Sequence, residues 1–578
     1  FKQTPAYAIL SGLVGSEMCI RDRTCLVYLI TLSVVFGSFP DAIGKNGAVS
    51  SSSSHASQVG IDVLKSGGNA IDAAIAVGFA LSVTFPNAGN LGGGGFMVVR
   101  TAQGDVSTID FREVAPKQAH RDMYLDDNGD VVPGMSLYTT HAAGVPGTVA
   151  GLGYAHEKYG TKSWNYLIRP AIKLASNGFE LNYRDAMYLN GSRSYFLRDD
   201  EAAKIFAEKE NYSVGDLFIQ KDLAKTLRRI SVVGAEEFYI GVPSDMIQSC
   251  MNRTGGIITK DDLSSYEAVE REPIEFDYRG YTFHSMPPAS SGGICIAEIL
   301  NQLETISFDS VSYHSAEHIQ PFVEAERRAY ADRAEYLGDT DFISVPISTL
   351  ISDSYALDRF SDYNPDAIIP SSDMGPGELI NFHESNETTH YSVVDKWGNA
   401  VSVTVTLNGK YGNGIVVDGA GFLLNNEMDD FSIKPGHPNM YGLVGKEANA
   451  VAPSKRMLSS MTPTIVEYPD GNLALVLGSP GGSTIITTVA QIAVNVIDFG
   501  MNIQDAVDSP RFHHQWLPDV IFYERNRFSK ETRRRLSESG YQFSEKRSIG
   551  EANCIQIGSS GIKFAAADSR RAAAALAY

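Results

Sequence analysis

Residues 387–395 read ETTHYSVVD, and two adjacent threonines, Thr388 and Thr389, open a strand-like run of β-branched and aromatic residues. A threonine hydroxyl is a weak nucleophile unless a base lies beside it. If the chain is cut just before a threonine, the freed α-amine supplies that base. A threonine pair followed by a β-rich segment is what a precursor that cleaves itself before a threonine would need. Paired threonines also occur in ordinary strands, so the rest of the chain has to decide.

The bulk composition is that of a large globular protein and excludes one class of partner. The chain has 578 residues, of which 43% are hydrophobic and 20% charged, and its formal net charge is −20. Nucleic acid is excluded as a partner because a phosphate backbone requires a basic face. The five cysteines form no CxxC pair and no metal-binding spacing: Cys19, Cys25, Cys250, Cys295 and Cys554. The first two fall in the N-terminal region, and we expect the other three to be buried or half-buried free thiols.

The N-terminal region is unlike the rest of the chain. Residues 25–36 (CLVYLITLSVVF) are an apolar run preceded by Arg21 and Arg23, a pattern typical of a signal peptide and also compatible with a short membrane anchor. Residues 11–23 (SGLVGSEMCIRDR) resemble translated adapter sequence. We therefore exclude residues 1–23 from the fold, assign 24–42 to a signal peptide or anchor, and expect a secreted or periplasmic protein.

The periodicity of apolar residues changes along the chain. Residues 58–83 predict two helices that are broken at Gly67-Gly68, and residues 164–341 are mostly helical in pattern. After about residue 381, strand-like runs dominate, at 391–395, 400–407, 464–468 and 473–477, followed by a helix near 485–497. This order predicts a layered α/β or α+β fold whose second part carries the central strands.

Acyl transfer requires a nucleophile, a base, an oxyanion hole and a substrate clamp. Thr388 with its own amine could supply the first two, and a hairpin could bring the Thr406 hydroxyl beside it. The β propensity of threonine by itself also explains a threonine at position 406 in a strand. Gly481 and Gly482 follow a predicted strand and precede a helix, so their amides could face a developing oxyanion. A simple strand-to-helix turn explains the same two glycines. The run GNLGGGGF (residues 89–96) allows close backbone approach but lacks the Lys-Ser/Thr of a phosphate-binding loop.

Other side chains could hold a zwitterionic substrate. Arg112 offers a guanidinium that suits a carboxylate, and the alternative is a local salt bridge with Asp110 or Glu113. Ser459 and Ser460 add two small hydroxyl donors. An ammonium group would face three further residues: Asn408, Glu427 and Asp430. The acidic stretch that contains the last two also fits a solvated turn or a cation site. One cation facing a carboxylate and acids facing an ammonium together suit a γ-glutamyl group.

From about residue 47 to residue 578, the chain resembles the γ-glutamyltranspeptidase (glutathione hydrolase) family of N-terminal-nucleophile hydrolases. The resemblance rests on motifs that occur together and in order: GNLGGGGF, DFRE, PPASSGG, YADRAEYLGD, TTHYSVVD, LLNNEMDDF, LSSMTPT, GSPGGS and PRFHHQWLPD. It implies an α+β fold, a four-layer αββα sandwich with two stacked central β-sheets. It also implies a proenzyme that cuts itself between Glu387 and Thr388 into a large subunit (43–387) and a small catalytic subunit (388–578), which stay associated.

The resemblance also implies an activity. Thr388 would attack the γ-amide of glutathione or a related γ-glutamyl compound, Gly481 and Gly482 would stabilise the oxyanion, and the γ-glutamyl ester would pass to water or to an amino acid or dipeptide. Arg112, Ser459 and Ser460 match the α-carboxylate clamp, and Thr406 matches the residue that supports the nucleophile. The α-amino clamp is matched by Asn408, Glu427 and Asp430. Tyr441 would close a lid loop at residues 435–446, and neither a cofactor nor a metal is implied.

Other functions stay open on the sequence alone. One is a different amidase of the same superfamily, such as a cephalosporin acylase, and the arginine, serines and acids of the clamp argue against it. Another is a poly-γ-glutamate-processing enzyme, which would need an open groove rather than a lid. A third is an unprocessed, inactive homologue that only binds a partner, and the presence of every catalytic position argues against that.

Overall fold

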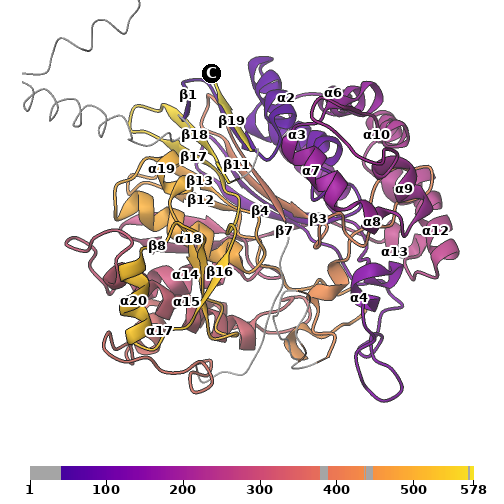
Figure 1. Ribbon diagram of the computed structural model, residues 1–578. Coiled ribbons are helices and arrows are strands. Elements are labelled where there is room, and N and C mark those ends of the chain that lie inside the picture. The colour runs from indigo at the N-terminus through magenta and orange to yellow at the C-terminus, as the bar shows by residue number, and fades with distance from the viewer. Residues whose placement is uncertain (1–40, 378–387, 435–436, 438–439, 441–446, 571–572) are drawn as a thin grey trace, which may run out of the picture. The chain divides into compact units, whose positions relative to one another are not determined.

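The computed structural model describes residues 41–377, 388–434, 437, 440, 447–570 and 573–578 (Figure 1). Thr388 is therefore described. Glu387, Tyr441 and the first forty residues, on which other sequence predictions depend, lie outside the described residues.

Two seven-stranded sheets form the centre of the molecule, and every neighbouring pair of strands in them is antiparallel. The first sheet has the order β19 (Ala574–Ala577), β2 (Ala48–Ser51), β10 (Thr389–Val394), β11 (Ala400–Thr406), β3 (Gly94–Arg100), β4 (Val106–Phe111), β7 (Val269–Arg271). The second has the order β1 (Ala42–Gly44), β18 (Lys563–Ala567), β17 (Asn553–Ile557), β13 (Leu473–Leu477), β12 (Thr464–Glu467), β9 (Tyr281–Ser285), β8 (Ile274–Tyr278).

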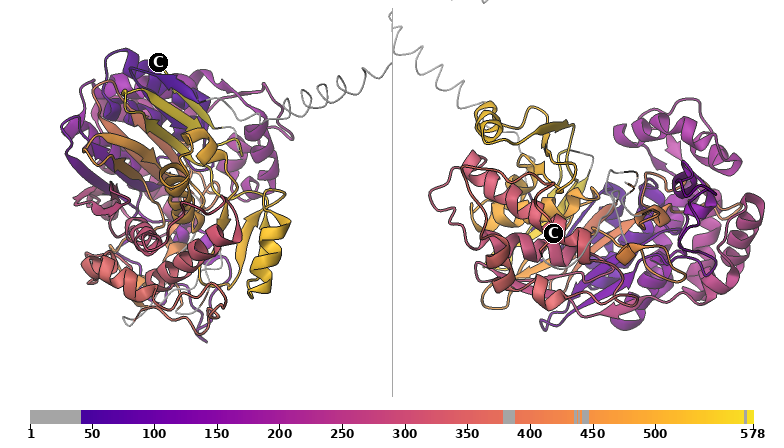
Figure 2. Two further views of the ribbon diagram at one scale, coloured as in Figure 1. Left: turned by 90° about the vertical axis from the view of Figure 1, so that its left-hand side faces the viewer. Right: turned by 90° about the horizontal axis from the view of Figure 1, so that it is seen from below.

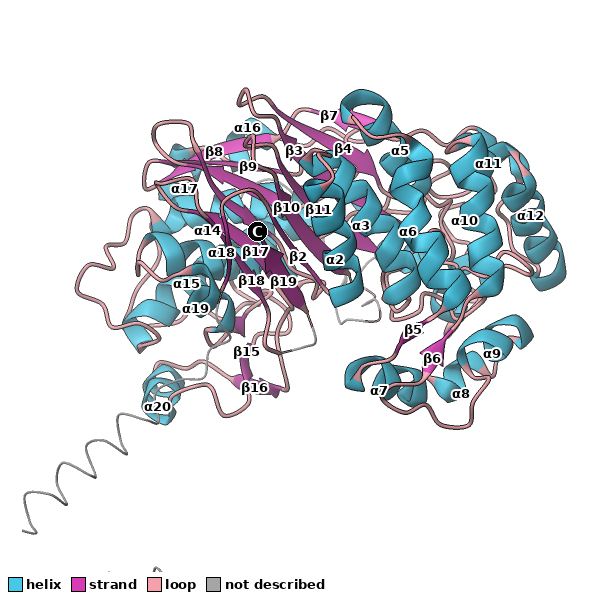
Figure 3. Cartoon of the chain, turned by 90° about the horizontal axis from the view of Figure 1, so that it is seen from above, coloured by secondary structure: helices cyan, strands magenta, loops and turns pink. Residues whose placement is uncertain are grey.

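Helices cover the outer face of each sheet (Figures 1 and 3). The first sheet is covered by α2 (Ser54–Lys65), α3 (Ala70–Thr84) and α5 (Thr148–Tyr159), with α6 (Trp164–Asn177) and α10 (Lys221–Val233) beyond them. The second is covered by α14 (Gly292–Leu303), α15 (Ala316–Tyr336), α18 (Thr484–Ile497) and α19 (Ile503–Asp508). Between the sheets, small and β-branched side chains such as Val98 and Val476 form a third apolar core. The predicted αββα sandwich is confirmed.

The remaining elements surround this sandwich. They are α4 (Met135–Tyr138), η2 (Thr140–Ala142), β5 (Phe179–Glu180), α7 (Tyr183–Gly191), α8 (Arg193–Phe196), α9 (Asp200–Phe206), β6 (Leu217–Phe218), α11 (Glu236–Ile240), α12 (Val242–Thr254), α13 (Lys260–Ser264), α16 (Ile347–Leu350), α17 (Asp353–Arg359), η3 (Glu427–Asp430), η4 (Glu447–Asn449), β14 (Phe512–His513), β15 (Ile521–Glu524), α20 (Lys530–Glu538) and β16 (Phe543–Lys546).

The predicted helix pair shows how local sequence builds one layer. Gly67 adopts φ +84° and ends α2, a conformation that a side chain would oppose. Asn69 then caps α3 by accepting from the Asp72 amide, while the Asp72 carboxylate accepts from the Asn69 amide. Every residue of α3 is buried because the helix lies between the sheet and the outer helices. The layer thus rests on one glycine break and one capping box.

Strands from before and after Thr388 lie side by side in both sheets, which Figures 1 and 2 show by the mixture of chain colours. The hairpin of β10 and β11 lies at the centre of the first sheet, between β2 and β3. In the second sheet β13 and β12 are central and β9 lies beside β12. The prediction that the second part of the chain carries the central strands is therefore confirmed.

Two details differ from the sequence reading. The mostly helical stretch 164–341 also contains the five-residue strands β8 and β9, and β8 (IEFDY) alternates buried apolar residues with exposed charged ones. The glycines at 92–95 have negative or extended φ, yet an added Cβ at Gly93 would lie 2.1 Å from the Thr406 carbonyl oxygen. The close backbone approach that the glycine run predicted is therefore present. Cys250, Cys295 and Cys554 are buried free thiols, as expected.

Candidate active site

Thr388 directly precedes β10, and 6% of its surface is exposed. The hairpin pairs Thr389 with Val405, so the same register continued by one residue sets Thr388 opposite Thr406. The Thr406 hydroxyl accepts a hydrogen bond from the Asn408 amide at 2.7 Å. The predicted hairpin thus exists and brings the two threonines to the same end of adjacent strands.

One small cavity collects most of the predicted site residues. Nine residues line it: Arg112, Thr388, Asn408, Glu427, Asp430, Ser459, Ser460, Met461 and Ile485. The first seven were chosen from the sequence, and they come from loops far apart along the chain. Met461 and Ile485 were missed, because an apolar side chain carries no chemical signal in a sequence.

Arg112 follows β4 and is 1% exposed. Its guanidinium donates to the Glu427 carboxyl group and, at 2.5 Å, to Asp430 Oδ2, and its Nε donates to the Met457 carbonyl at 3.2 Å. Glu113 lies 3.7 Å from the same guanidinium. The local pairing considered from the sequence is therefore present, but the two distant acids make the closer contacts.

The charges around this guanidinium shift one another's pKa values. Although burial disfavours its charged form, Glu427 and Asp430 raise the pKa of Arg112 above the ordinary value. Burial raises the pKa of Glu427 well above its usual range and that of Glu113 to about 7, and Arg112 opposes both shifts. Three buried carboxyl groups thus lie around one buried cation. The ammonium of a zwitterionic ligand could pair with these acids while its carboxylate pairs with Arg112, without changing the net charge of the site.

Local geometry fixes the acidic side of the cavity. Glu427 and Asp430 lie on the single turn η3, so both carboxyl groups face the same way. Asn408 adopts φ +65° and its Nδ2 donates to the Asn426 carbonyl at 3.0 Å. Among the described residues, Glu427 Oε2 has no hydrogen-bond partner. A buried acceptor without a partner is costly unless a ligand supplies the donor.

Two serines also line the cavity. Ser459 and Ser460 are each 2% exposed. Within the described part of the chain the Ser460 hydroxyl has no partner, whereas Ser459 Oγ accepts from the Met461 amide at 3.2 Å. A buried hydroxyl without a protein acceptor beside a guanidinium suits a carboxylate oxygen.

Gly481 and Gly482 lie in the turn between β13 and α18, with φ values of +138° and +59°. The loop is held tightly, because Thr484 Oγ1 donates to the Gly481 carbonyl at 2.7 Å. At its start, a Cβ on Gly478 would lie 2.2 Å from the His390 ring. Burial lowers the pKa of His390 to about 3, so this ring is neutral. The nucleophile strand and the glycine loop therefore pack directly against each other.

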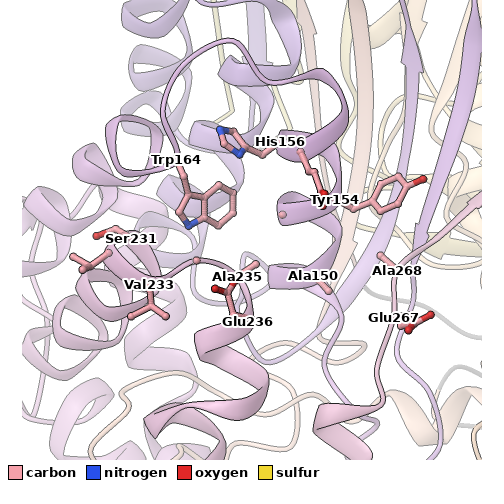
Figure 4. Close-up of a pocket in the computed structure, with 14 residues that line it drawn as sticks. Ala150, Tyr154, His156, Trp164, Ser231, Val233, Ala235, Glu236, Glu267 and Ala268 are labelled. Carbon is pink, nitrogen blue, oxygen red and sulfur yellow. The ribbon is translucent and has the colours of Figure 1, made fainter.

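A second hollow shares no lining residue with this cavity (Figure 4). It is bordered by α5, the start of α6 and the end of α10, and Tyr154, His156, Trp164 and Glu236 line it. None of the residues chosen from the sequence lies there. The small cavity at Thr388 has the nucleophile and the charged clamp, so chemistry and not size marks the candidate active site.

Comparison with known proteins fits this geometry. A sequence profile of the γ-glutamyltranspeptidase family matches residues 56–578. The chain belongs to the γ-glutamyltranspeptidase family. The glutathione hydrolase proenzyme of Escherichia coli (strain K12) is 51% identical over 565 residues, which cover 97% of this chain and 96% of that protein.

Solved structures agree with the family assignment. A cephalosporin acylase from Bacillus halodurans superposes with a TM-score of 0.84 at 27% identity, covering 94% of this chain and 98% of that chain. A Helicobacter pylori γ-glutamyltranspeptidase chain gives a TM-score of 0.56 at 48% identity, covering 56% of this chain and 94% of that one. The fold is that of the N-terminal-nucleophile hydrolases. In the part of the chain that the structure describes, we find no helix long and apolar enough to cross a bilayer.

Proposed function

We propose that this family member is a self-processing γ-glutamyl transferase and hydrolase that acts on glutathione and related γ-glutamyl compounds. The observation that carries the proposal is the single cavity in which Thr388 faces one guanidinium, two acids and two serine hydroxyls. The family assignment and the glutathione hydrolase relatives support the same activity.

Maturation would begin at the bond before Thr388. The Thr388 hydroxyl attacks the Glu387 carbonyl, the acyl group moves from nitrogen to oxygen, and water hydrolyses the resulting ester. The products are a large subunit ending at Glu387 (43–387) and a small subunit of residues 388–578, held together by their shared sheets. Cleavage frees the α-amine of Thr388, which becomes the general base of the mature enzyme.

In turnover, the Thr388 hydroxyl would give its proton to that amine and attack the γ-carbonyl carbon of the substrate. Negative charge then develops on the carbonyl oxygen, where the Gly481 and Gly482 amides would stabilise it. The amine returns its proton to the leaving amino group, and a γ-glutamyl-threonine ester remains. Water, or the amino group of an amino acid or dipeptide, then attacks the ester and regenerates Thr388. No step in this sequence requires a metal or a cofactor.

The clamp would hold the glutamyl end through charge. Arg112, Ser459 and Ser460 would bind the α-carboxylate, and Thr406 would orient the nucleophile. The α-ammonium would be bound by Asn408, Glu427 and Asp430. Tyr441 would close over the bound group from the lid loop at residues 435–446. We also propose export through residues 24–42, either as a cleaved signal or as an anchor.

The test is the N-terminal sequence and intact mass of each chain in a purified preparation, together with release of glutamate from glutathione. We expect a fragment that begins Thr388-Thr389-His390 and an active sample. Thr388→Ala should give one uncut, inactive chain. Two fragments from that variant would refute Thr388 as the processing nucleophile. Because one neighbour in structure is a cephalosporin acylase, a cephalosporin should be assayed in parallel, and faster turnover of it would overturn the substrate assignment.

A further inference from the structure

Helix α15 is unusual because it is both buried and highly charged. All of its residues except Glu317 are buried, although it carries glutamates, aspartate and arginines along its length. Several of these charges have specific partners. Arg327 and Arg328 both donate to Glu324 at 2.6 Å, and Asp332 accepts from Arg359 at 2.8 Å. Some of these buried ion pairs lie within α15, and others join α15 to neighbouring elements, as Arg359 of α17 does with Asp332.

Arg333 carries one of these connections toward the cavity. It is 1% exposed, and its Nε donates to Ser291 Oγ at 2.7 Å. Ser291 precedes α14 and belongs to the motif PPASSGG (residues 287–293), for which the sequence suggested no role. This motif runs beside the two serines of the cavity, with Ser290 bridged in parallel to Ser459 and the Ser459 amide donating to the Ala289 carbonyl at 2.8 Å.

The Ser459 carbonyl oxygen receives two hydrogen bonds from one residue. Both the amide and the hydroxyl of Ser291 donate to it, each at 2.7 Å. The direction of the hydroxyl bond is fixed, because an arginine Nε can only donate. Ser291 Oγ must accept from Arg333, which leaves its single proton for the Ser459 carbonyl. The chain of donors from Arg333 through Ser291 polarises that carbonyl.

Polarisation of this carbonyl acts on the opposite side of the same peptide. The bond between Ser459 and Ser460 is trans, so the Ser460 N–H points away from Ser291. Both serines line the cavity, and the Ser460 hydroxyl has no partner among the described residues. The orientation of the Ser460 N–H is thus set by the peptide that Ser291 and Arg333 hold, and Ser460 lines the same cavity as Arg112.

We propose that Ser291 and Arg333 are positioning residues, which orient and polarise the Ser459–Ser460 peptide toward the α-carboxylate of the γ-glutamyl substrate. The inference rests on the proposed function, and it adds two residues that lie behind the serines proposed to bind the substrate. It predicts that both residues act on recognition of the carboxylate and not on the chemical step at Thr388.

The test compares two substrates on the mature, cut enzyme: γ-glutamyl-4-nitroanilide and its analogue with an α-carboxamide. In Ser291→Ala we expect kcat/KM for the first to fall roughly tenfold, through KM, because the Ser459–Ser460 peptide would lose the support that orients it toward the carboxylate, and weakening one hydrogen bond to a charged group has about this effect. For the carboxamide analogue kcat/KM should stay the same. The preference for carboxylate over carboxamide should therefore shrink by the same factor.

Ser290→Ala is the matched control. Ser290 is as deeply buried as Ser291, but its hydroxyl lies 2.6 Å from the Met461 carbonyl and 3.5 Å from that of Ser459. We expect Ser290→Ala to change the preference less than about twofold. An equal loss of preference in both variants would reduce Ser291 to a structural role.

A second pair of variants tests Arg333 itself. The same pair tests the inference if Ser291→Ala fails to mature. Lysine can still donate to Ser291 Oγ, whereas methionine cannot. KM for the carboxylate substrate should increase from wild type to Arg333→Lys to Arg333→Met, with kcat nearly constant. If the wild-type enzyme is active and all of these variants keep its preference for carboxylate over carboxamide, the inference is overturned while the proposed function stands. Wild-type enzyme without γ-glutamyl activity would overturn the proposed function, and this inference with it.

Discussion

Asp429→Asn should stabilise the protein at alkaline pH and not at acid pH. Asp429 lies on η3 and is 1% exposed, accepting from Ser136 Oγ at 2.6 Å and from the Met440 amide at 3.2 Å. Burial raises the pKa of Asp429 from 3.8 to about 7, and the neighbouring Asp430 adds to the shift. Asparagine has nearly the shape of a protonated aspartate and keeps one acceptor oxygen.

The sign and size follow from linkage. The folded chain holds the proton up to a pKa of about 7, whereas the unfolded chain releases it near 3.8. Folding stability is therefore lost as pH rises between these two values. A shift of about 3 units corresponds to about 4 kcal/mol. The variant should gain almost nothing at pH 4 and about 4 kcal/mol at pH 8, or roughly 4 °C in midpoint for a chain of this size.

The assay is thermal unfolding at pH 4, 6 and 8 in a Thr388→Ala background, where every sample is expected to be one uncut chain. Asp127→Asn is the control, because Asp127 is exposed and its replacement should leave the midpoint unchanged. A gain of the same size at pH 4 and pH 8 would refute the reasoning, since only a titrating carboxyl group makes the gain depend on pH. Destabilisation at every pH would show that the hydrogen bonds matter more than the charge.

Three further substitutions test the cavity and its supports. Arg112→Ala should raise KM for glutathione at least tenfold and lower the unfolding midpoint, because a buried cation is taken from its carboxyl partners; an unchanged kcat/KM would remove it from the clamp. Thr406→Ala should slow both maturation and turnover, and wild-type rates for both would make it an ordinary strand residue. Gly478→Ala should impair maturation strongly, because the new Cβ meets the His390 ring at 2.2 Å. Gly191→Ala, with nothing within 4 Å of its Cβ, should mature normally, and equal maturation of the two glycine variants would contradict the packing argument.

Much of the sandwich could be predicted because its signals are local. Strand β13 was predicted with the bounds that the structure shows, and α2 and α3 break at the predicted glycines. β8 and β9 were missed although β8 alternates apolar and charged residues, because each strand is only five residues long and stands within a mostly helical stretch. Local patterns also carry no information about which strands become neighbours, so the interleaved order of the sheets could only be implied by the resemblance.

The residues of the candidate site could be predicted where the side chain itself has a charged or nucleophilic group. A nucleophile, a cation and two acids were recognisable, and they do share one cavity. The contact between Arg112 and both acids was not expected, because the sequence assigned these residues to opposite ends of a substrate. Ser291 and Arg333 were also missed. They act through a backbone carbonyl, and no pattern of residue types shows where a carbonyl points.

The interleaving of strands has a consequence for the lifetime of the processed protein. β10 pairs with β2, β11 with β3, β12 with β9 and β18 with β1, so each piece of a chain cut before Thr388 supplies strands that the other needs for pairing on both sheets. The pieces can separate only if both sheets come apart, which is nearly the barrier to complete unfolding. Once apart, they would have to find each other by diffusion while exposing unpaired strand edges. The cut therefore turns a reversible folding equilibrium into a one-way process, and the working life of the enzyme is set by the rate of its first unfolding event.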